Sequence, residues 1–340
     1  MDYQERNRKM KRFVLTAGML AGALLTGCGQ GLETQNRKER YIAVICKGSQ
    51  HEFWKTVEQG ARDAGEELDI RITFEAPEDE SQIDLQIDMV EQAIENQADA
   101  IVLAPLDTER LNHVIDKAVN KGIPVLTFDS DVSTESRVAT IGTNNQSVGA
   151  IAIAARNAAG LINGEGKVAI VSYVEGAQTA IERKAGFINE IEEKYGNRIE
   201  VVGISYCEGD PELAKKQALE FIEKYPDLKC IYGPNEGCAV GVVAAIREKH
   251  LENRICVIGF DSSDDEIAYL ADGAIDGMVV QNPYNMGYLG VRNINKVLDG
   301  KDVDEKIDTG ATYVDRDNLY DEDTQWLLYP LGKAADSGEE

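Results

Sequence analysis

The chain of 340 residues has few of the residues and spacings on which several classes of function depend. Its three histidines, His51, His113 and His250, are scattered and do not have the spacing of a zinc site. It contains no P-loop, and the glycines of "NGEGKVAI" precede a strand-like run instead of following one, unlike those of a dinucleotide-binding turn. We therefore expect neither a metal nor a cofactor.

Positive charge is also scarce. The chain has 35 Lys and Arg against 60 Asp and Glu, which gives a net charge of −25. Residues 1–27 carry five basic and two acidic residues, so the rest of the chain has a net charge of −28. Binding to nucleic acid needs clustered Lys and Arg. We therefore exclude nucleic acid as a partner and interpret the acidic surface as a source of solubility.

The apolar run near the start of the chain is too short to span a bilayer, which takes about 20 residues. This run, "FVLTAGMLAGALL", follows the basic segment "RNRKMKR" and predicts a secretory signal peptide over residues 1–27. It ends in "LLTGC", which resembles the bacterial lipobox and implies that Cys28 is lipid-modified. The alternative is a plain signal peptide with an incidental Cys28. Residues 28–40 are then a polar tether, and residues 332–340 a polar tail.

The other five cysteines form no C-x-x-C pair. Cys46, Cys230 and Cys256 lie in or beside apolar strand-like runs, which favours buried free thiols over a disulfide framework. A bridge between Cys207 and Cys230 remains as an alternative.

From residue 41, apolar runs of strand length alternate with amphipathic runs of helical length. The first series has strands at 41–46, 70–75, 99–105 and 124–129, and helices at 52–68, 80–97 and 107–122. The second series has strands at 167–173, 198–206, 228–234 and 255–261, and helices at 177–195, 210–225 and 235–250. Such alternation predicts βαβ units and parallel sheets.

The two series correspond to each other. "IAVIC" at residue 42 matches "VAIVS" at residue 168, and Phe-Asp-Ser at 128–130 recurs at 260–262. Asp129 and Asp261 therefore end equivalent strands of two similar α/β lobes. Because ligands of open α/β sheets bind beyond the carboxyl ends of the strands, we expect both aspartates to face one cleft. Ionised aspartate accepts hydrogen bonds only, so the pair suits an uncharged, polyhydroxylated ligand.

Residues 41–333 resemble bacterial periplasmic sugar-binding proteins of the ribose-binding type, which serve ABC transporters. The matching segments are "HEFW", "IPVLTFDS", "ERKAGF", "YPDLKCIYGPNE", "VIGFDSS" and "VVQNPYNMGYLGV". The resemblance implies an α/β fold of two Rossmann-like lobes with parallel sheets, joined by a three-stranded hinge. The implied first lobe is 41–143 plus 282–309, and the second is 144–281 plus 310–331.

The resemblance also implies the ligand contacts, which are Phe53, Trp54, Asp129, Arg183, Asn235, Asp261 and Gln281. The chemistry fits a sugar, because aromatic faces bind C–H faces, Arg donates in a fixed geometry, and Asn and Gln both donate and accept. Three positions depart from ribose binders: His51 replaces asparagine, Ser130 replaces arginine and Gly209 replaces an aromatic residue. We expect these changes to enlarge the cleft and to select a sugar other than ribose, with His51 and Ser130 in the site.

Each assignment has a structural alternative. The two aromatic residues could pack in the core, and the aspartates could be turn residues that cap the following helix. Arg183 could be a solvated helix residue, and His51 could simply precede the first helix.

The prediction is a monomeric solute-binding lipoprotein at the outer face of the cell membrane, held there by its lipid alone. It captures a sugar or polyol, delivers it to an ABC permease and catalyses no reaction. A ligand-presenting partner of a receptor kinase or chemoreceptor remains an alternative. A third interpretation is a glycoside hydrolase, in which the two carboxylates are the acid and the nucleophile. A sugar-responsive repressor is excluded, because the lipobox stands where its DNA-binding segment would be.

Overall fold

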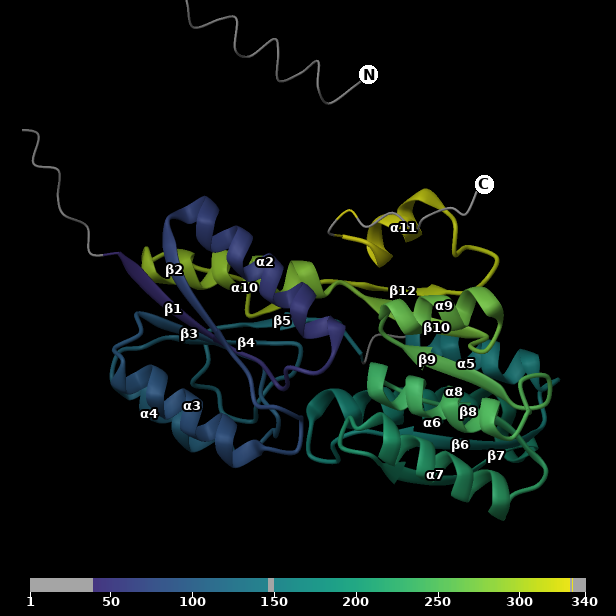
Figure 1. Cartoon of the computed structure of the whole chain (residues 1–340). Helices are drawn as coiled ribbons and strands as arrows, with labels where there is room; N and C mark the ends of the chain where they lie inside the picture. Colours follow the sequence, from purple (N-terminus) through teal and green to yellow (C-terminus); the bar gives the residue numbers. More distant parts are fainter. Residues whose placement is uncertain (1–38, 146–149, 331, 333–340) are drawn as a thin grey trace, which may run out of the picture. The chain divides into compact units, whose positions relative to one another are not determined.

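The computed structural model describes residues 39–145, 150–330 and 332. The predicted signal peptide, Cys28 and all but the first residue of the predicted tail 332–340 lie outside the described residues. The predicted fold class is confirmed: the described chain forms two α/β lobes, each built on a six-stranded sheet (Figure 1).

The helices and strands follow the two predicted series. The first series comprises β1 (Arg40–Ile45), α2 (Glu52–Leu68), β2 (Ile70–Glu75), α3 (Ile83–Glu95), β3 (Ala100–Leu103), α4 (Asn112–Asn120), β4 (Val125–Phe128) and β5 (Thr140–Gly142). The second comprises α5 (Ala150–Leu161), β6 (Gly166–Ser172), α6 (Gln178–Tyr195), the 3-10 turn η1 (Gly196–Arg198), β7 (Ile199–Tyr206), α7 (Pro211–Lys224), β8 (Leu228–Tyr232), α8 (Glu236–Glu248), β9 (Cys256–Phe260), α9 (Asp264–Asp272) and β10 (Gly277–Gln281). The chain ends with α10 (Pro283–Leu298), β11 (Lys306–Asp308), β12 (Ala311–Val314) and α11 (Glu322–Leu328).

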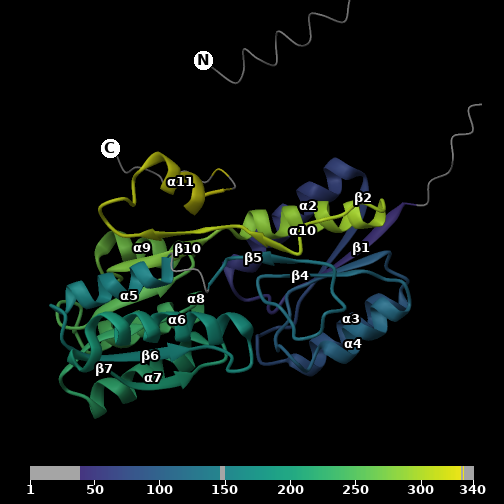
Figure 2. The same ribbon diagram turned by 180° about the vertical axis from the view of Figure 1, so that it is seen from behind.

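The strand orders show how the chain passes between the lobes. The first sheet has the order β11-β5-β4-β3-β1-β2, and the second has the order β12-β10-β9-β8-β6-β7. Strand pairs are parallel except for β10 with β12. The chain therefore crosses after β5, after β10 and again between β11 and β12, a passage that Figure 2 shows from behind. The exact residues at which the lobes divide stay a prediction.

Two helices begin several residues later than the sequence predicts. Helix α3 starts at Ile83 rather than at residue 80, and α4 starts at Asn112 rather than at residue 107. In the second case, the carboxylate of Asp107 accepts hydrogen bonds from the amides of Glu109 and Arg110, both at 2.8 Å. An aspartate that bonds nearby amides in this way stabilises a turn in place of helix.

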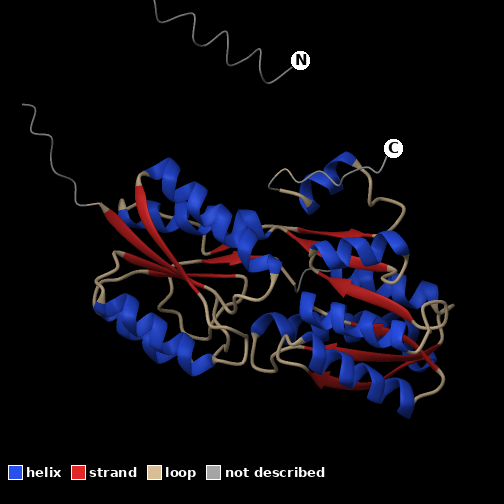
Figure 3. Cartoon of the chain, in the orientation of Figure 1, coloured by secondary structure: helices blue, strands red, loops and turns tan. Residues whose placement is uncertain are grey.

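Each sheet is covered by helices on both faces (Figure 3). In the first lobe, α2 and α10 pack on one face of the sheet and α3 and α4 on the other. In the second lobe, α5 and α6 lie on one face, and α7, α8 and α9 on the other. Within the described part of the chain, no helix combines the length and apolar character needed to cross a bilayer.

Helices α2 and α10 are in backbone contact through two glycines. A Cβ atom on Gly60 would lie 2.1 Å from the carbonyl oxygen of Tyr284, and one on Gly287 would lie 2.0 Å from the carbonyl oxygen of Val57. Any side chain at either position would clash, so glycine is required for this close approach.

Candidate functional site

The predicted site residues come together where the carboxyl ends of the two sheets face each other. One cleft is lined by His51, Phe53, Trp54, Asp129, Arg183, Asn235, Asp261 and Gln281, together with Lys47, Glu80, Tyr173 and Thr179. Ser130 lies beside them, because Lys47 donates a hydrogen bond to its hydroxyl. The space between these side chains is about 20 Å³, whereas small-molecule sites usually enclose about 300 Å³ or more. The two lobes therefore contact each other directly across the cleft.

Asp129 and Asp261 have equivalent backbone conformations. Both have a positive φ, 58° and 84° respectively, which is uncommon outside glycine. Each amide donates to a neighbouring strand, to the carbonyl of Ile141 or of Val279, at 2.8 Å. The repeated strand ending thus reproduces the same bend in both lobes and turns each aspartate into the cleft.

The carboxylate of Asp129 lies between two cations. Lys47 Nζ is 2.6 Å from Asp129 Oδ2, and Arg183 Nη2 is 3.8 Å from Oδ1. Lys47 lies in the loop after β1, next to Cys46, and also donates to the hydroxyl of Thr179, 3.3 Å away in α6. Because α6 belongs to the second lobe, Lys47 bridges the two lobes.

Asp261 has neutral hydrogen-bond partners instead. Its Oδ1 accepts from Gln281 Nε2 at 2.6 Å, and its Oδ2 accepts from the amide of Glu236 at 3.2 Å. Burial raises the pKa of Asp261, although the charge of Arg183 and the bond from Gln281 oppose the rise. The Oε1 atom of Gln281 is buried and has no hydrogen-bond partner within the described part of the chain. It is an acceptor that a ligand hydroxyl can satisfy.

Arg183 is buried, with 2% of its surface exposed, so it is not the solvated helix residue of the alternative interpretation. Its guanidinium carbon lies 3.8 Å from the ring centroid of Phe260, and its Nη1 donates to the carbonyl of Pro234 at 2.9 Å. The adjacent Asn235 caps α8, since its Oδ1 accepts from the amide of Cys238 at 2.9 Å.

The two aromatic residues occupy the first turn of α2 at the edge of the core. Phe53 and Trp54 meet edge to face, with ring centroids 4.8 Å apart. Both are buried in the core of the first lobe and both line the cleft. Trp54 Nε1 also donates to Glu80 at 3.2 Å. The core interpretation of this pair therefore holds, and their position at the cleft leaves a ligand contact as a prediction.

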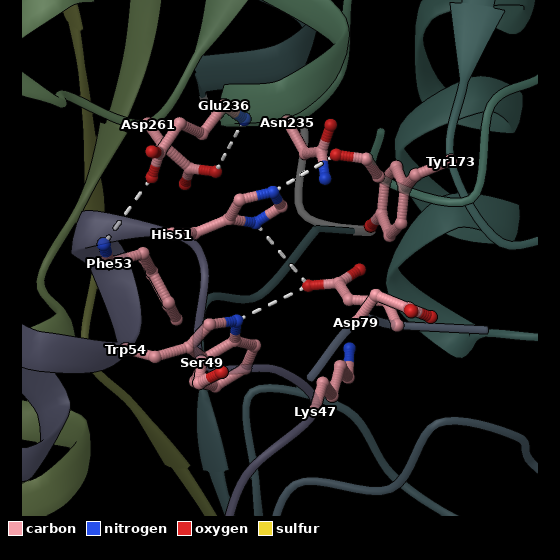
Figure 4. A network of polar contacts seen from close by, with 12 residues as sticks. Lys47, Ser49, His51, Phe53, Trp54, Asp79, Tyr173, Asn235, Glu236 and Asp261 are labelled. Atoms are coloured by element: carbon pink, nitrogen blue, oxygen red, sulfur yellow. Dashed lines mark hydrogen bonds and ion pairs between the residues drawn. The ribbon is translucent and has the colours of Figure 1, made fainter. Parts of the chain in front are cut away.

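His51 connects the lobes through its ring (Figure 4). Its Nε2 is 3.0 Å from the carbonyl of Gly209, and its Nδ1 is 3.6 Å from Glu80 Oε1. Burial alone lowers the pKa of His51, but the carboxylates of Glu80 and Glu236 outweigh this effect and raise the pKa to about 10. The ring is therefore an imidazolium ion at neutral pH.

The expected enlargement of the cleft stays a prediction, but the structure shows which side chains stand beside Ser130 and Gly209. Lys47 places its ammonium group against Ser130, so it supplies the positive charge that was expected to be lost there. A Cβ atom on Gly209 would lie 3.3 Å from His51 Cε1, so the ring of His51 fills the space beside this glycine. Side chains from other positions thus occupy the space that the two departures would open.

Two acidic side chains each accept hydrogen bonds from the N-terminus of a helix in the opposite lobe. The carboxylate of Glu236, at the start of α8, accepts from the amides of Glu52 and Phe53 in α2, at 3.2 and 3.4 Å. The carboxylate of Glu52 accepts from the amide of Asp264 at the start of α9, at 2.9 Å. Negative groups are stabilised at helix N-termini. We call these contacts of Glu52 and Glu236 the reciprocal clasp.

Burial raises the pKa of Glu236 to about 7, although the charge of His51 opposes the rise. Figure 4 shows Glu236 beside Asn235 and Asp261, above His51 in this view. The clasp is therefore part of the same polar network as the site.

The sequence interpretation missed five residues, which are Lys47, Glu80, Tyr173, Thr179 and Glu236. Lys47 had a signal, because it is a charged residue in the loop just after a buried strand, as Asp129 is. Glu236 also had one, since it directly follows the predicted site residue Asn235 and begins α8. Glu80 lies in a loop before α3 and had no comparable signal. The described residues contain no group of three or more His, Cys, Asp or Glu arranged to hold a metal ion.

Residues 42–302 match the periplasmic binding protein domain family. The D-ribose/D-allose-binding protein of Pseudomonas aeruginosa is 29% identical over 307 residues, which cover 86% of this chain and 94% of that protein. The ribose import binding protein of Bacillus subtilis is 26% identical over 306 residues, which cover 88% of this chain and 97% of that protein.

Solved structures agree with these relatives. A carbohydrate transporter solute-binding protein from Agrobacterium radiobacter, in complex with D-arabinose, has a TM-score of 0.82 and 31% identity, and the match covers 86% of this chain and 99% of that one. An ABC transporter solute-binding protein from Agrobacterium vitis, with bound D-fucose, has a TM-score of 0.82 and 34% identity, and the match covers 85% of this chain and 100% of that one. With its two lobes and its shared cleft, the chain belongs to the periplasmic binding protein family.

Proposed function

We propose that this protein binds a sugar or related polyol between its lobes and delivers it to an ABC importer. The observation that carries the proposal is the pair of aspartates, Asp129 and Asp261, which end equivalent strands and face one cleft. The names of the relatives, which include binders of D-ribose, D-allose, D-arabinose and D-fucose, support the same ligand class.

The charges around the cleft favour a neutral ligand. Lys47, His51 and Arg183 bring three cations to the site, and the carboxylates that contact or approach them lie at 2.6 to 3.8 Å. Positive and negative groups are thus interspersed, with no excess of one sign to select a charged ligand. Hydroxyl groups can both donate and accept, so they can replace the contacts that these side chains now make with one another.

Ligand entry requires the lobes to separate, because the cleft encloses only about 20 Å³. A second cavity of about 310 Å³ shares Asp129 with the cleft and is lined by residues of both lobes, including Gln178 and Asp308. We propose that a ligand held by both lobes favours the closed arrangement, which the permease then recognises. In this proposal Phe53, Trp54 and Asp129 hold the ligand from the first lobe, and Arg183, Asn235 and Asp261 hold it from the second.

Glycoside hydrolysis is the competing function that one observation favours. A glycosidase needs one carboxyl group with a raised pKa, and burial gives Asp261 this property. However, both oxygens of Asp261 accept hydrogen bonds, an arrangement that orients a carboxylate as an acceptor. We assign no catalytic residue, and incubation with aryl glycosides should release no product.

We further propose that the protein is a monomer anchored outside the cytoplasm by a lipid on Cys28. One anchor of two acyl chains holds a protein at a membrane without a transmembrane helix. A Cys28→Ser variant should move from the membrane fraction to the soluble fraction, and retention at the membrane would contradict the lipobox interpretation. Presentation of the ligand to a receptor kinase or chemoreceptor remains the alternative to import.

The ligand is tested by a thermal-shift screen against pentoses, hexoses, polyols and short glycosides, followed by calorimetry on the best compound. Asp129→Ala and Asp261→Ala should each weaken binding by about 2 kcal/mol or more, because they leave ligand hydroxyls unpaired. Asp272→Ala is the matched control, since this carboxylate pairs with Arg247 on the surface. Normal binding by both cleft variants, or no stabilisation by any sugar, would overturn the proposal.

A further inference from the structure

Two buried cysteines of the second lobe lie in contact. The Sγ atoms of Cys207 and Cys238 are 3.3 Å apart, and neither residue is exposed. The sequence alternative paired Cys207 with Cys230, which is wrong for this fold. Cys230 is instead the register partner of Cys256 on the neighbouring strand.

The contact joins two segments that carry site residues. Cys207 begins the loop 207–210 after β7, and the carbonyl of Gly209 in this loop is the contact of His51. Cys238 lies in the first turn of α8, and its amide is capped by the side chain of Asn235. A bond between the two sulfur atoms would fasten this loop to the N-terminus of α8, directly behind the cleft.

We propose that Cys207 and Cys238 are a modification site that forms a reversible disulfide. The oxidant is a low-molecular-weight disulfide or a thiol–disulfide oxidoreductase. One cysteine thiolate attacks the oxidant and releases one thiol, and the second thiolate then attacks the mixed disulfide and releases the other. The protein loses two protons and two electrons, and the oxidant disulfide is reduced to two thiols. Disulfides persist outside the cytoplasm, so the physiological relevance of this site rests on the location proposed above.

Access to the buried thiols requires movement of the loop. Burial and the hydrogen bond to Cys207 raise the pKa of the Cys238 thiol, so little thiolate forms in the packed state. Glu208 and Asp210 are exposed on either side of Gly209, so the loop runs along the surface. Opening of this short segment is enough to admit an oxidant, and we expect the reaction to be slow.

The second cysteine pair provides an internal control. Cys230 and Cys256 are direct neighbours on the parallel strands β8 and β9. Such strands lie about 4.8 Å apart with their side chains side by side, whereas a disulfide brings the two Cβ atoms to about 3.8 Å. Both strands are fixed in the centre of the sheet, so we expect this pair to stay reduced.

The test is a redox titration of the purified full chain in mixtures of reduced and oxidised dithiothreitol. Free thiols are trapped by alkylation and mapped by peptide mass spectrometry. We expect a linked pair of peptides containing Cys207 and Cys238, about 2 Da lighter than the two thiol peptides together, with Cys230 and Cys256 alkylated. Alkylation of Cys207 and Cys238 across the whole titration, or a link from Cys207 to Cys230, would overturn the proposal.

Thermal unfolding gives a second readout. The disulfide would close a loop of about 30 residues, so oxidation should raise the melting temperature of the wild type by about 5 °C. Cys256→Ser should show the same rise, and Cys238→Ser should show none. An equal rise in Cys238→Ser would contradict the assignment. If Cys238→Ser does not fold, the peptide map of the wild type still tests the proposed disulfide. No ligand is present in either experiment, so a negative result leaves the sugar-binding proposal untouched.

Discussion

The two lobes present the same residue on the same bent strand ending, but they surround it differently. Asp129 in the first lobe is paired with Lys47 and approached by Arg183. Asp261 in the second lobe is held by the amide groups of Gln281 and Glu236. One carboxylate is thus balanced by cations and the other by neutral donors.

The two lobes share the backbone of this strand ending but differ in the side chains that contact the aspartate. The backbone bend and the amide bond to the adjacent strand are the same in both lobes. The side-chain partners come from segments outside the repeated strand, namely the loop after β1 for Lys47 and the end of β10 for Gln281. We infer that the bend fixes the position of each carboxylate, while these added partners set how it responds to mutation and pH.

The largest expected effect is the loss of the charged partner. Asp129→Ala leaves the Lys47 ammonium group buried without its carboxylate, which should lower the free energy of unfolding by about 3 to 5 kcal/mol. Asp261→Ala removes hydrogen bonds from neutral donors and should cost about 1 to 3 kcal/mol. Denaturant unfolding measures both values. The double variant Lys47→Met/Asp129→Ala should recover part of the loss, and equal losses in the two single variants would contradict the comparison.

His51 should make the free energy of unfolding fall at alkaline pH. Its pKa in the folded protein is about 10, above the ordinary value of 6.5. Its stabilisation is therefore complete below pH 6.5 and is lost as pH rises toward 10. At about 1.4 kcal/mol per pH unit, the decline between pH 6 and pH 9.5 should reach about 4 kcal/mol. His51→Asn should abolish this decline in unfolding experiments at pH 6, 8 and 9.5. An unchanged decline in the variant would place the titrating group elsewhere.

Glu236 should make the free energy of unfolding fall over a lower range of pH. Burial raises its pKa from 4.5 to about 7, so its contribution to stability is complete below pH 4.5 and is lost as pH rises through 7. The wild type should therefore lose about 2 to 3 kcal/mol from this group across that window. The free energy of unfolding of Glu236→Gln should be compared with that of the wild type at two pH values. The difference should favour the variant more at pH 8 than at pH 5. No change in the difference between the two proteins with pH would contradict this assignment.

The smallest expected effect lies in the other half of the reciprocal clasp. Glu52 is only half-buried and bonds a single amide, that of Asp264. Glu52→Gln keeps an acceptor but removes the charge at the start of α9, so stability should fall by about 0.5 to 1 kcal/mol. Thermal unfolding in low salt measures the change. A loss as large as that of Asp129→Ala would show that the clasp, and not the buried ion pair, dominates the contact between the lobes.

Much of the fold could be predicted from the sequence, because strand and helix periods alternate and the Phe-Asp-Ser ending repeats. The predicted segments misplace helix starts where a side chain, such as that of Asp107, bonds local amides in place of the helix. The residues that the family resemblance named as ligand contacts line one cleft, although their roles stay predictions. The missing members, Lys47, Glu80 and Glu236, act through contacts between distant segments, which sequence spacing does not reveal.

The expectation of a larger cleft stays a prediction, and it rests on single positions. It considered only what was lost at Ser130 and Gly209. The structure fills both places with side chains from another part of the chain, Lys47 and His51. The size of a cavity depends on every side chain around it, so changes at single positions do not predict it.

The glycine contact between α2 and α10 has a mechanical consequence. Helix α10 begins at Pro283, two residues after Gln281, where the chain returns from the second lobe. Its backbone is locked against α2 by Gly60 and Gly287, so neither helix can slide past the other. Any rotation about the connecting strands must then carry the N-terminus of α2 as one rigid body with α10. The aromatic pair at that N-terminus therefore changes its position with the angle between the lobes, without any change in its own conformation.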